Sequence, residues 1–211
     1  MRLYDYWRSS AAYRVRIALN LKGIAYQQVS VDLRAKAQQE GAYLEKNPQG
    51  LVPLLEDGEV RLAQSLAIID YLDDVHPEPA LLPDEPKERA RARSLALLIA
   101  CDIHPLNNLR VLTYLERELG VDEDRRLAWY RHWIALGLGA LERELIDHKA
   151  AFALGERPTL VDVCLVPQMA NARRYRCDLE PYPTLRVIDE HCQTIPAIAA
   201  AAPDRQPDAV G

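Results

Sequence analysis

The segment that decides the fold is Tyr6-Trp7-Arg8-Ser9-Ser10-Ala11-Ala12-Tyr13-Arg14-Val15-Arg16-Ile17-Ala18-Leu19. It lies at the junction of a predicted first strand, residues 3–7, and a predicted first helix with an apolar face at helical spacing. Ser9 or Ser10 is a favourable N-cap for that helix. The start of a helix presents bare N–H groups and the positive end of the helix dipole, so this junction is suited to holding an anion such as a thiolate. The alternative interpretation is that both serines only cap the helix.

Up to about residue 76 the chain alternates between strand and helix patterns. After the first strand and helix, the sequence predicts a strand over 25–31, a polar helix over 35–46, and a hairpin over 51–62 that turns at Asp57-Gly58. A further helix is predicted from about Ser65. The resulting order, βαβαββα, is that of a thioredoxin-like unit.

A proline-rich segment then interrupts the pattern, with four prolines between residues 76 and 86. Beyond it the apolar spacing is helical throughout, and helices are predicted over 87–101, 106–119, 123–145, 160–174 and 183–191. Thr159 and Asp162 form a capping box at the start of the fourth of these helices. We therefore expect a thioredoxin-like domain at 1–76, a linker at 77–86 and an all-helical domain at 87–211, with a loosely ordered tail after Ile198.

Composition excludes several classes of protein. The chain has 211 residues and a net charge of −5, with its basic residues spread among acidic ones, so no nucleic-acid partner is expected. No apolar run approaches membrane-spanning length, and the chain enters its first strand without a secretory segment. The four cysteines are scattered without the spacing of a metal site, which predicts free thiols, no metal and a cytoplasmic location.

Two further motifs in the first domain predict a ligand groove. A proline inside a strand cannot donate to the ladder, so Val52-Pro53 marks either an edge or a place where pairing stops. In thioredoxin-like folds this proline is commonly cis, which leaves the backbone of Val52 to pair with a bound peptide. Gln64-Ser65 opens the next helix, where Ser65 serves only as a cap or also helps to bind a carboxylate. One site for a thiolate, one for a peptide backbone and one for an amino-acid carboxylate match the shape of glutathione.

The chain resembles the zeta class of the glutathione transferases, the family of the maleylacetoacetate and maleylpyruvate isomerases. The resemblance covers nearly the whole sequence. It is carried by residues 6–10 (YWRSS), 14–19 (RVRIAL), 47–53 (NPQGLVP), 64–72 (QSLAIIDYL) and 102–112 (DIHPLNNLRVL). The family usually reads Ser-Ser-Cys where this chain has Ser9-Ser10-Ala11. A mechanism that uses a protein thiol at that position is therefore excluded, and the thiol chemistry must belong to glutathione.

The resemblance implies a role for each matching residue. Ser9 would face the glutathione sulfur, with Ser10 beside it. The other predicted contacts to glutathione, each from a matching position, are Gln38 and Gln49 at the glycyl end, Val52 and Pro53 at the cysteinyl backbone, Gln64 and Ser65 at the γ-glutamyl carboxylate, and His104 from the helical domain. His104 has an alternative interpretation as a locally satisfied histidine before Pro105.

The implied reaction is the glutathione-dependent cis–trans isomerisation of maleylpyruvate or maleylacetoacetate in aromatic catabolism. A dicarboxylic keto acid requires cations, and the candidates are Arg8, Arg110 and Arg176, with Arg174 able to replace Arg176. The residues leave the two substrates open, although the missing cysteine and Arg176 favour maleylpyruvate. The alternatives are a transferase that conjugates small electrophiles and a non-enzymatic assembly module. The family also implies a homodimer.

Overall fold

The first strand, β1 (Arg2–Asp5), lies in the interior of a four-stranded sheet in the order β2-β1-β3-β4. The computed structural model describes residues 1–147 and 149–209. β2 (Gln27–Ser30) runs parallel to β1, whereas β3 (Leu54–Asp57) and β4 (Val60–Ala63) form an antiparallel hairpin on its other side. Gly58 has a φ of +58° in the predicted hairpin turn. The expected thioredoxin-like unit is confirmed.

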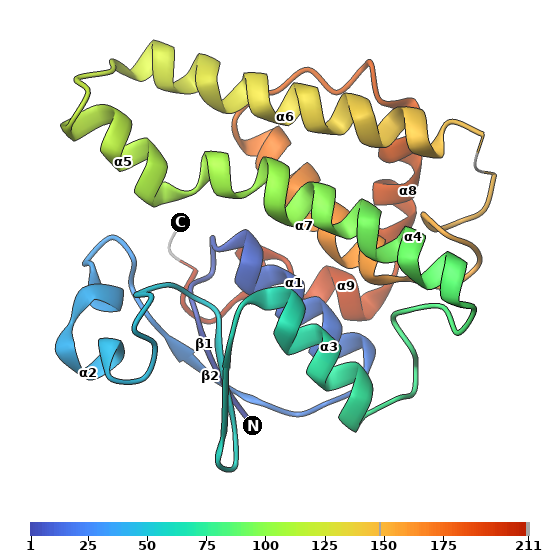
Figure 1. The fold of residues 1–211 in the computed structure, drawn as a ribbon, viewed down its shortest axis with the longest axis horizontal. Helices are drawn as coiled ribbons and strands as arrows, with labels where there is room; N and C mark the ends of the chain where they lie inside the picture. Colours follow the sequence, from blue (N-terminus) through green and yellow to red (C-terminus); the bar gives the residue numbers. More distant parts are fainter. Residues whose placement is uncertain (148, 210–211) are drawn as a thin grey trace. The chain divides into compact units, whose positions relative to one another are not determined.

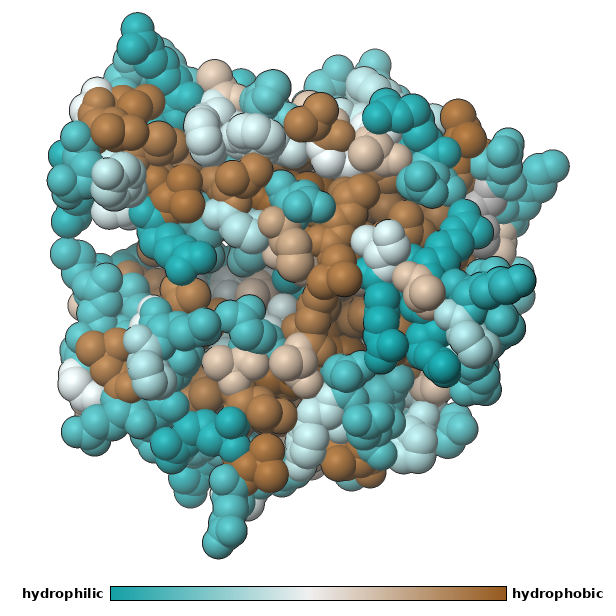
Figure 2. All heavy atoms as spheres, in the orientation of Figure 1, coloured by the Kyte–Doolittle hydropathy of each residue, from teal (hydrophilic) through white to brown (hydrophobic). Residues whose placement is uncertain are grey.

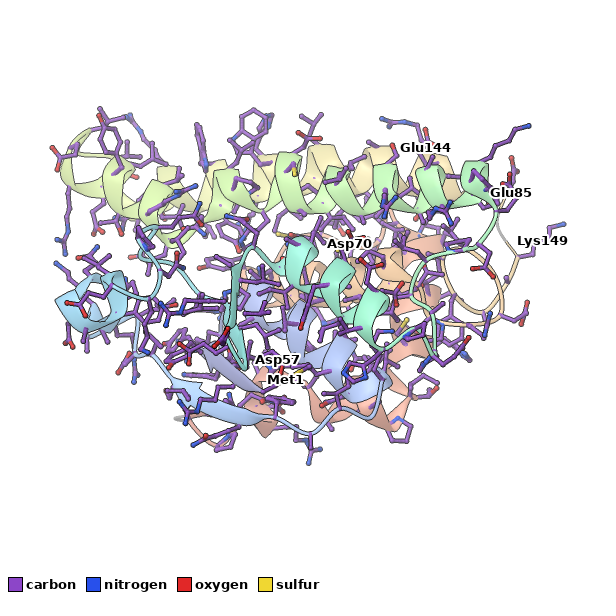
Figure 3. All side chains as sticks on the ribbon, turned by 60° about the horizontal axis from the view of Figure 1, so that its bottom comes forward. Met1, Asp57, Asp70, Glu85, Glu144 and Lys149 are labelled. Atoms are coloured by element: carbon purple, nitrogen blue, oxygen red, sulfur yellow. The ribbon has the colours of Figure 1, made fainter. Side chains whose placement is uncertain are left out.

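The register brings three chain segments to one end of the sheet. Tyr4 pairs with Leu54, and Leu54 pairs with Ala63. The chain leaving β1, the chain entering β3 and the chain leaving β4 therefore meet at that end. Met1 and Asp57 lie near each other at the opposite end in Figure 3, as the pairing of Arg2 with Glu56 requires.

Helices α1 (Ser10–Leu21) and α3 (Ser65–Val75) lie side by side in this unit, and the short helix α9 (Pro196–Ala200) packs on α1 (Figure 1). Their apolar faces are fully buried, and so are the facing strand residues; examples are Leu3, Val15, Ile17, Leu19, Leu55 and Ile68. This burial is the main stabilising contribution to the unit.

The predicted polar helix over 35–46 is wrong in extent. The structure has a 3-10 turn, Ala37–Gln39, and a four-residue helix, α2 (Gly41–Leu44), separated by Glu40 in an extended conformation. A glycine at the restart and a left-handed Lys36 (φ +59°) before the 3-10 turn both oppose a continuous helix.

The proline-rich segment is attached at its beginning to the N-terminal unit. The buried Lys22 Nζ donates to the carbonyls of His76 (2.7 Å) and Pro79 (2.9 Å) and pairs with Asp73 at 2.7 Å. Asp73 in turn accepts from the N–H of Leu81 at 3.0 Å. Contacts accordingly group Met1–Leu81 in one unit and Leu82–Cys192 in another.

The C-terminal segment departs from expectation. From Gln193 onward it groups with the N-terminal unit and not with the helical one. It forms α9 and a 3-10 turn, Pro203–Arg205, so the expected loose order after Ile198 is wrong. The physical reason is a set of polar anchors on α1: Asn20 Nδ2 donates to the Ala197 carbonyl at 3.0 Å and Arg16 Nε to the Ala201 carbonyl at 2.9 Å.

The helical unit contains α4 (Pro86–Leu97), α5 (Leu109–Arg117), α6 (Glu123–Leu145), α7 (Leu160–Arg174) and α8 (Pro183–Gln193). Glu85, labelled in Figure 3, caps α4 by accepting from Glu88 N at 2.9 Å. The predicted capping box of α7 is present: Asp162 accepts from the N–H of Thr159 at 2.8 Å and from its hydroxyl at 2.9 Å. Asp162 therefore has the structural role expected of it.

Between α4 and α5 the chain forms a π-helical turn, Leu98–Ile103, and then a 3-10 turn, Pro105–Asn107. Within Pro86–Arg117, one 18-residue window has a mean hydropathy of 1.2, so this stretch is long and apolar enough to cross a membrane by length and composition. Its apolar residues are interrupted at Asp102 and Pro105, so the stretch contains no continuous apolar run of that length. A single such stretch is weak support for a membrane span, because core helices of soluble proteins have the same length and composition.

Candidate functional site

Ser9 is the N-cap of α1. Its backbone is extended, its Oγ accepts from the N–H of Ala12 at 3.2 Å, and its own N–H donates to the Tyr6 carbonyl at 2.8 Å. Because a capping hydroxyl only accepts, its hydrogen is left to donate toward a ligand. Ser10 is the first helical residue and is buried. The start of α1 thus combines a hydroxyl donor with the positive end of the helix dipole, as an anion site requires.

Arg8 precedes this cap and is exposed. Its guanidinium lies over the Trp7 ring, 4.1 Å from the ring centroid. Stacking on an aromatic face restrains a long cationic side chain without using its hydrogen-bond donors. Arg8 is therefore a restrained cation next to the capping serine.

Helix α3 is not capped by Ser65, contrary to the prediction from the sequence. Gln64, not Ser65, is the N-cap, with a φ of +71°. Ser65 is the first helical residue, and its buried hydroxyl accepts from Arg14 Nη1 at 3.3 Å. Gln64 Nε2 donates to Gln49 Oε1 at 2.8 Å, so the structure brings these two predicted residues together.

Val52 lies just outside the sheet ladder. Its peptide bond to Pro53 is cis, and β3 begins only at Leu54. Leu51, the residue before Val52, is fixed because its carbonyl accepts from Tyr43 Oη at 2.6 Å and from Asn47 Nδ2 at 2.7 Å. Burial raises the pKa of Tyr43 to about 12, so this hydroxyl remains a donor at neutral pH.

Gln38 packs against the turn that carries Gln49. Gly50 in that turn has a φ of +60°, and a Cβ there would lie 3.1 Å from the Gln38 carbonyl oxygen. The side-chain Oε1 of Gln38 is buried, with no hydrogen-bond partner among the described residues. An orphaned buried acceptor of this kind is costly unless a ligand or water satisfies it.

The remaining predicted residues belong to the helical unit. His104 joins the π-helical turn to the 3-10 turn and donates its N–H to the Ile99 carbonyl at 3.0 Å. Arg110 is exposed in the first turn of α5, where Asn108 caps its N–H at 3.1 Å. Arg176 is exposed just after α7, with a φ of +52°.

Two neighbours of Arg176 differ in their partners. Arg173 forms an ion pair with the buried Asp189, so it is engaged within the unit. The Arg174 guanidinium lies over the Tyr175 ring, 5.3 Å from the centroid, and remains exposed. Arg174 and Arg176 therefore both stay available for a substrate.

Sequence reasoning gave no role to Arg14 or Arg16, both almost fully buried on α1. Two arginines within an otherwise apolar helix were the available signal, since buried charge requires a partner. Among residues 1–147 and 149–209, no three histidine, cysteine or acidic side chains lie together so that they could hold a metal ion. The four cysteines are free thiols.

Known proteins share this architecture and sequence. The family profile "Glutathione S-transferase, N-terminal domain" matches residues 1–74. A probable maleylacetoacetate isomerase of Vibrio cholerae is 50% identical over 209 residues, which is 98% of this chain and 97% of that protein.

Two solved structures extend the likeness over the whole fold. One, described as a holo maleylpyruvate isomerase and bacterial zeta-class glutathione S-transferase, has a TM-score of 0.98 at 44% identity and covers 100% of both chains. The other, a maleylacetoacetate isomerase of Anaeromyxobacter dehalogenans with dicarboxyethyl glutathione and citrate in its active site, has a TM-score of 0.88 at 46% identity and covers 99% of this chain and 93% of that one. This chain belongs to the zeta class of the glutathione S-transferases, the family of the maleylacetoacetate and maleylpyruvate isomerases.

Proposed function

We propose that this protein is a glutathione-dependent cis–trans isomerase that converts maleylpyruvate or maleylacetoacetate to the fumaryl product in the breakdown of aromatic compounds. The observation that carries the proposal is the convergence, at one end of the sheet, of the start of α1, the start of α3 and the backbone of Val52. The family to which the chain belongs supports it.

The residues at that end fit glutathione. Ser9 and Ser10 would hold the sulfur, Val52 before Pro53 the cysteinyl backbone, and Gln64 with Ser65 the γ-glutamyl carboxylate. Gln49 and Gln38 would bind the glycyl end. The glycyl amide N–H would there donate to Oε1 of Gln38, which is unpartnered within the part of the chain that the structure describes. We assign His104 of the helical unit to glutathione as well.

Glutathione, when bound, supplies a thiolate that adds reversibly to the cis double bond, which permits rotation before the thiolate leaves again. A free thiol has a pKa of about 8.5, and lowering it by two units requires about 2.7 kcal/mol. A helix terminus contributes at most about 2 kcal/mol, and a charge-assisted hydrogen bond contributes about 1.5–3 kcal/mol. Neither contribution is comfortably sufficient alone, so the Ser9 hydroxyl and the start of α1 act together.

The substrate carries two carboxylates and a keto group, which arginine recognises through its planar, permanently charged fork. Arg8 is the first candidate because it is restrained on Trp7 beside Ser9. Arg110 and Arg176, with Arg174 as the replacement, are the candidates from the helical unit. An arginine near the developing enolate oxygen would also stabilise the transition state.

Steady-state turnover of both keto acids, with and without catalytic glutathione, tests the proposal. We expect turnover only with glutathione and no net consumption of it. Consumption of glutathione with simple electrophiles, and no isomerisation, would instead identify a conjugating transferase. Failure to bind glutathione at all would identify an assembly module.

We further propose a cytoplasmic homodimer. Leu97 on α4 and Leu136 on α6 are 44% and 58% exposed, and Figure 2 shows hydrophobic side chains among the polar ones over these helices. A second copy would cover such an apolar surface. Light scattering should give twice the chain mass of 23.9 kDa; a monomer at micromolar concentration would contradict this.

A further inference from the structure

The C-terminal segment is hydrogen-bonded to the turn that precedes α1. Asp208 Oδ2 accepts from the backbone N–H of Trp7 at 3.1 Å, across 201 residues of sequence. The same oxygen accepts from Ser30 Oγ at 3.0 Å, which fixes the carboxylate at the end of β2. A carboxylate on a backbone N–H is among the stronger hydrogen bonds in a protein.

The same segment reaches the turn a second time through Arg16. Arg16 Nη2 donates to the Trp7 carbonyl at 3.1 Å, while its Nε donates to the Ala201 carbonyl at 2.9 Å. The buried Asp5 orients this guanidinium, since Arg16 Nη1 donates to its two oxygens at 2.7 and 2.9 Å. The peptide groups on both sides of Trp7 are therefore held by side chains.

Trp7 is the central residue of the turn that presents the candidate catalytic groups. The turn closes when Ser9 N–H donates to the Tyr6 carbonyl, and Arg8 stacks on the Trp7 ring. A shift of Trp7 would therefore displace both the Ser9 hydroxyl and the Arg8 guanidinium. Displacements of about 1 Å in a catalytic group lower rates by up to about a hundredfold.

We propose that Asp208 is a positioning residue, which holds the Tyr6–Ser9 turn in the shape that presents Ser9 to the glutathione sulfur and Arg8 to the substrate. This inference rests on the proposed function for its catalytic consequence. Its structural core, the fixation of Trp7 by the C-terminal segment, is testable in the protein without any ligand.

A positioning role and a purely electrostatic role predict opposite effects on the bound thiol. Removing a negative charge near the site would by Coulomb's law lower the pKa of a nearby thiol. Loosening the turn would raise it, because the thiolate would lose part of the Ser9 hydrogen bond. The direction of the change therefore identifies the role.

The experiment compares Asp208→Ala, Asp208→Asn and the matched control Asp204→Ala, which removes the same charge from an exposed position of the same segment. Amide hydrogen exchange at Trp7 is measured in the ligand-free proteins, the thiol pKa by ultraviolet absorbance with bound glutathione, and kcat and KM with both keto acids. Ser30→Ala, an exposed site that also orients the carboxylate, serves as the second variant if Asp208→Ala does not fold.

For Asp208→Ala we expect Trp7 exchange at least about tenfold faster, a raised thiol pKa, and kcat about 10- to 100-fold lower. KM for glutathione should rise only as far as the lost thiolate stabilisation requires. Asp208→Asn keeps an acceptor, so its Trp7 exchange and its kcat should stay near the wild-type values, as should those of Asp204→Ala. In Ser30→Ala the Trp7 amide should also exchange faster than in the wild-type protein.

Unchanged Trp7 exchange in Asp208→Ala, or in Ser30→Ala where that variant decides, overturns the inference. A lowered thiol pKa in Asp208→Ala also overturns it. So does an Asp208→Asn protein whose Trp7 exchange and kcat are as strongly changed as those of the alanine variant. A wild-type enzyme that fails to isomerise either keto acid overturns the proposed function instead and leaves the exchange result standing.

Discussion

Ser9 caps α1 and is the proposed hydrogen-bond donor to the thiolate, and two measurements on one variant distinguish these roles. Ser9→Ala removes the N-cap of α1, at a cost of about 0.5–2 kcal/mol of stability, and the donor proposed for the thiolate. We expect turnover at neutral pH to fall about 10- to 100-fold, the equivalent of a charge-assisted hydrogen bond. Kinetics with saturating glutathione, together with thermal melting, give the two effects independently.

The controls for this prediction are Ser9→Thr and Tyr6→Phe. Threonine keeps both the cap and the hydroxyl, so it should retain most of the activity. Tyr6 is buried at the end of β1, and loss of its hydroxyl should change the rate far less. The reverse ranking of Ser9→Ala and Tyr6→Phe would assign thiol activation to the tyrosine.

Gln64 combines backbone strain with a proposed role in binding glutathione. Its φ of +71° is unfavourable for any residue with a Cβ, and its amide bridges to Gln49. Gln64→Ala loses the bridge and keeps the strain, whereas Gln64→Gly loses both. Strain of about 1–3 kcal/mol at such a φ should outweigh the entropic cost of glycine, so we expect the glycine variant to be more stable than the alanine variant in urea unfolding, while KM for glutathione rises in both. Equal stabilities would show that this backbone is not strained.

The capping role of the serine before α1 was predictable from the sequence, whereas the role of Ser65 was not, for a physical reason. A serine cap at Ser9 or Ser10 followed from the local pattern, because the capping hydroxyl and the N–H that donates to it lie three residues apart. Ser65 was misassigned by one residue, since its hydroxyl is engaged by Arg14, 51 residues away. Long-range partners of this kind leave no trace in local spacing.

The last residue of the π-helical turn Leu98–Ile103 packs closely on α6 at Gly137, which has no side chain. A Cβ at Gly137 would lie 2.2 Å from Ile103 Cγ1, well inside van der Waals contact. Gly137→Ala should therefore destabilise the helical unit by about 1–3 kcal/mol, as overpacked cores do. Chemical denaturation gives the free energy of unfolding directly.

Gly139, on the same helix, is the matched control. The nearest atoms to its added Cβ are 3.8 Å away, so Gly139→Ala should be neutral or stabilising by up to about 1 kcal/mol. Adding Ile103→Ala to Gly137→Ala should cost less stability than the sum of the two single substitutions, because alanine at position 103 removes both clashing atoms, Cγ1 and Cδ1. A Gly137→Ala protein as stable as Gly139→Ala would contradict this account of the turn.

The long helices were predictable because 3.6-residue periodicity survives in them. The predicted and observed limits of α6 and α7 coincide, at 123–145 and 160–174. The helix predicted over 87–101 instead becomes π-helical after Leu97. The turn packs on α6 through Ile103 and Gly137, a tertiary contact that the local pattern around residue 100 does not contain.

The segment after Ile198 also depends on long-range contacts that local sequence patterns do not contain. Small and polar residues after Ile198 gave no periodic signal, yet the segment is ordered by single hydrogen bonds from Arg16, Asn20 and Trp7. Each of these bonds joins residues more than 170 positions apart. Composition therefore indicated a loose end where the fold contains a structural segment.

Ligand stabilisation of the whole protein tests the anion site without any turnover. Glutathione at a hundred times its dissociation constant should stabilise the folded state by about 2.7 kcal/mol and raise the melting temperature accordingly. If the start of α1 lowers the thiol pKa on binding, affinity must rise with pH between the bound and the free thiol pKa values, because the bound form loses its proton first.

S-methylglutathione has no thiol proton, so its stabilising effect should lack this rise between pH 6 and 8.5. The difference between the two melting curves across that range therefore isolates the thiolate from the rest of the ligand. In Ser9→Ala the glutathione curve should move toward that of the methylated compound, because less thiolate stabilisation remains. Parallel pH dependences of the two ligands in the wild-type protein would mean that the start of α1 does not bind the sulfur as an anion.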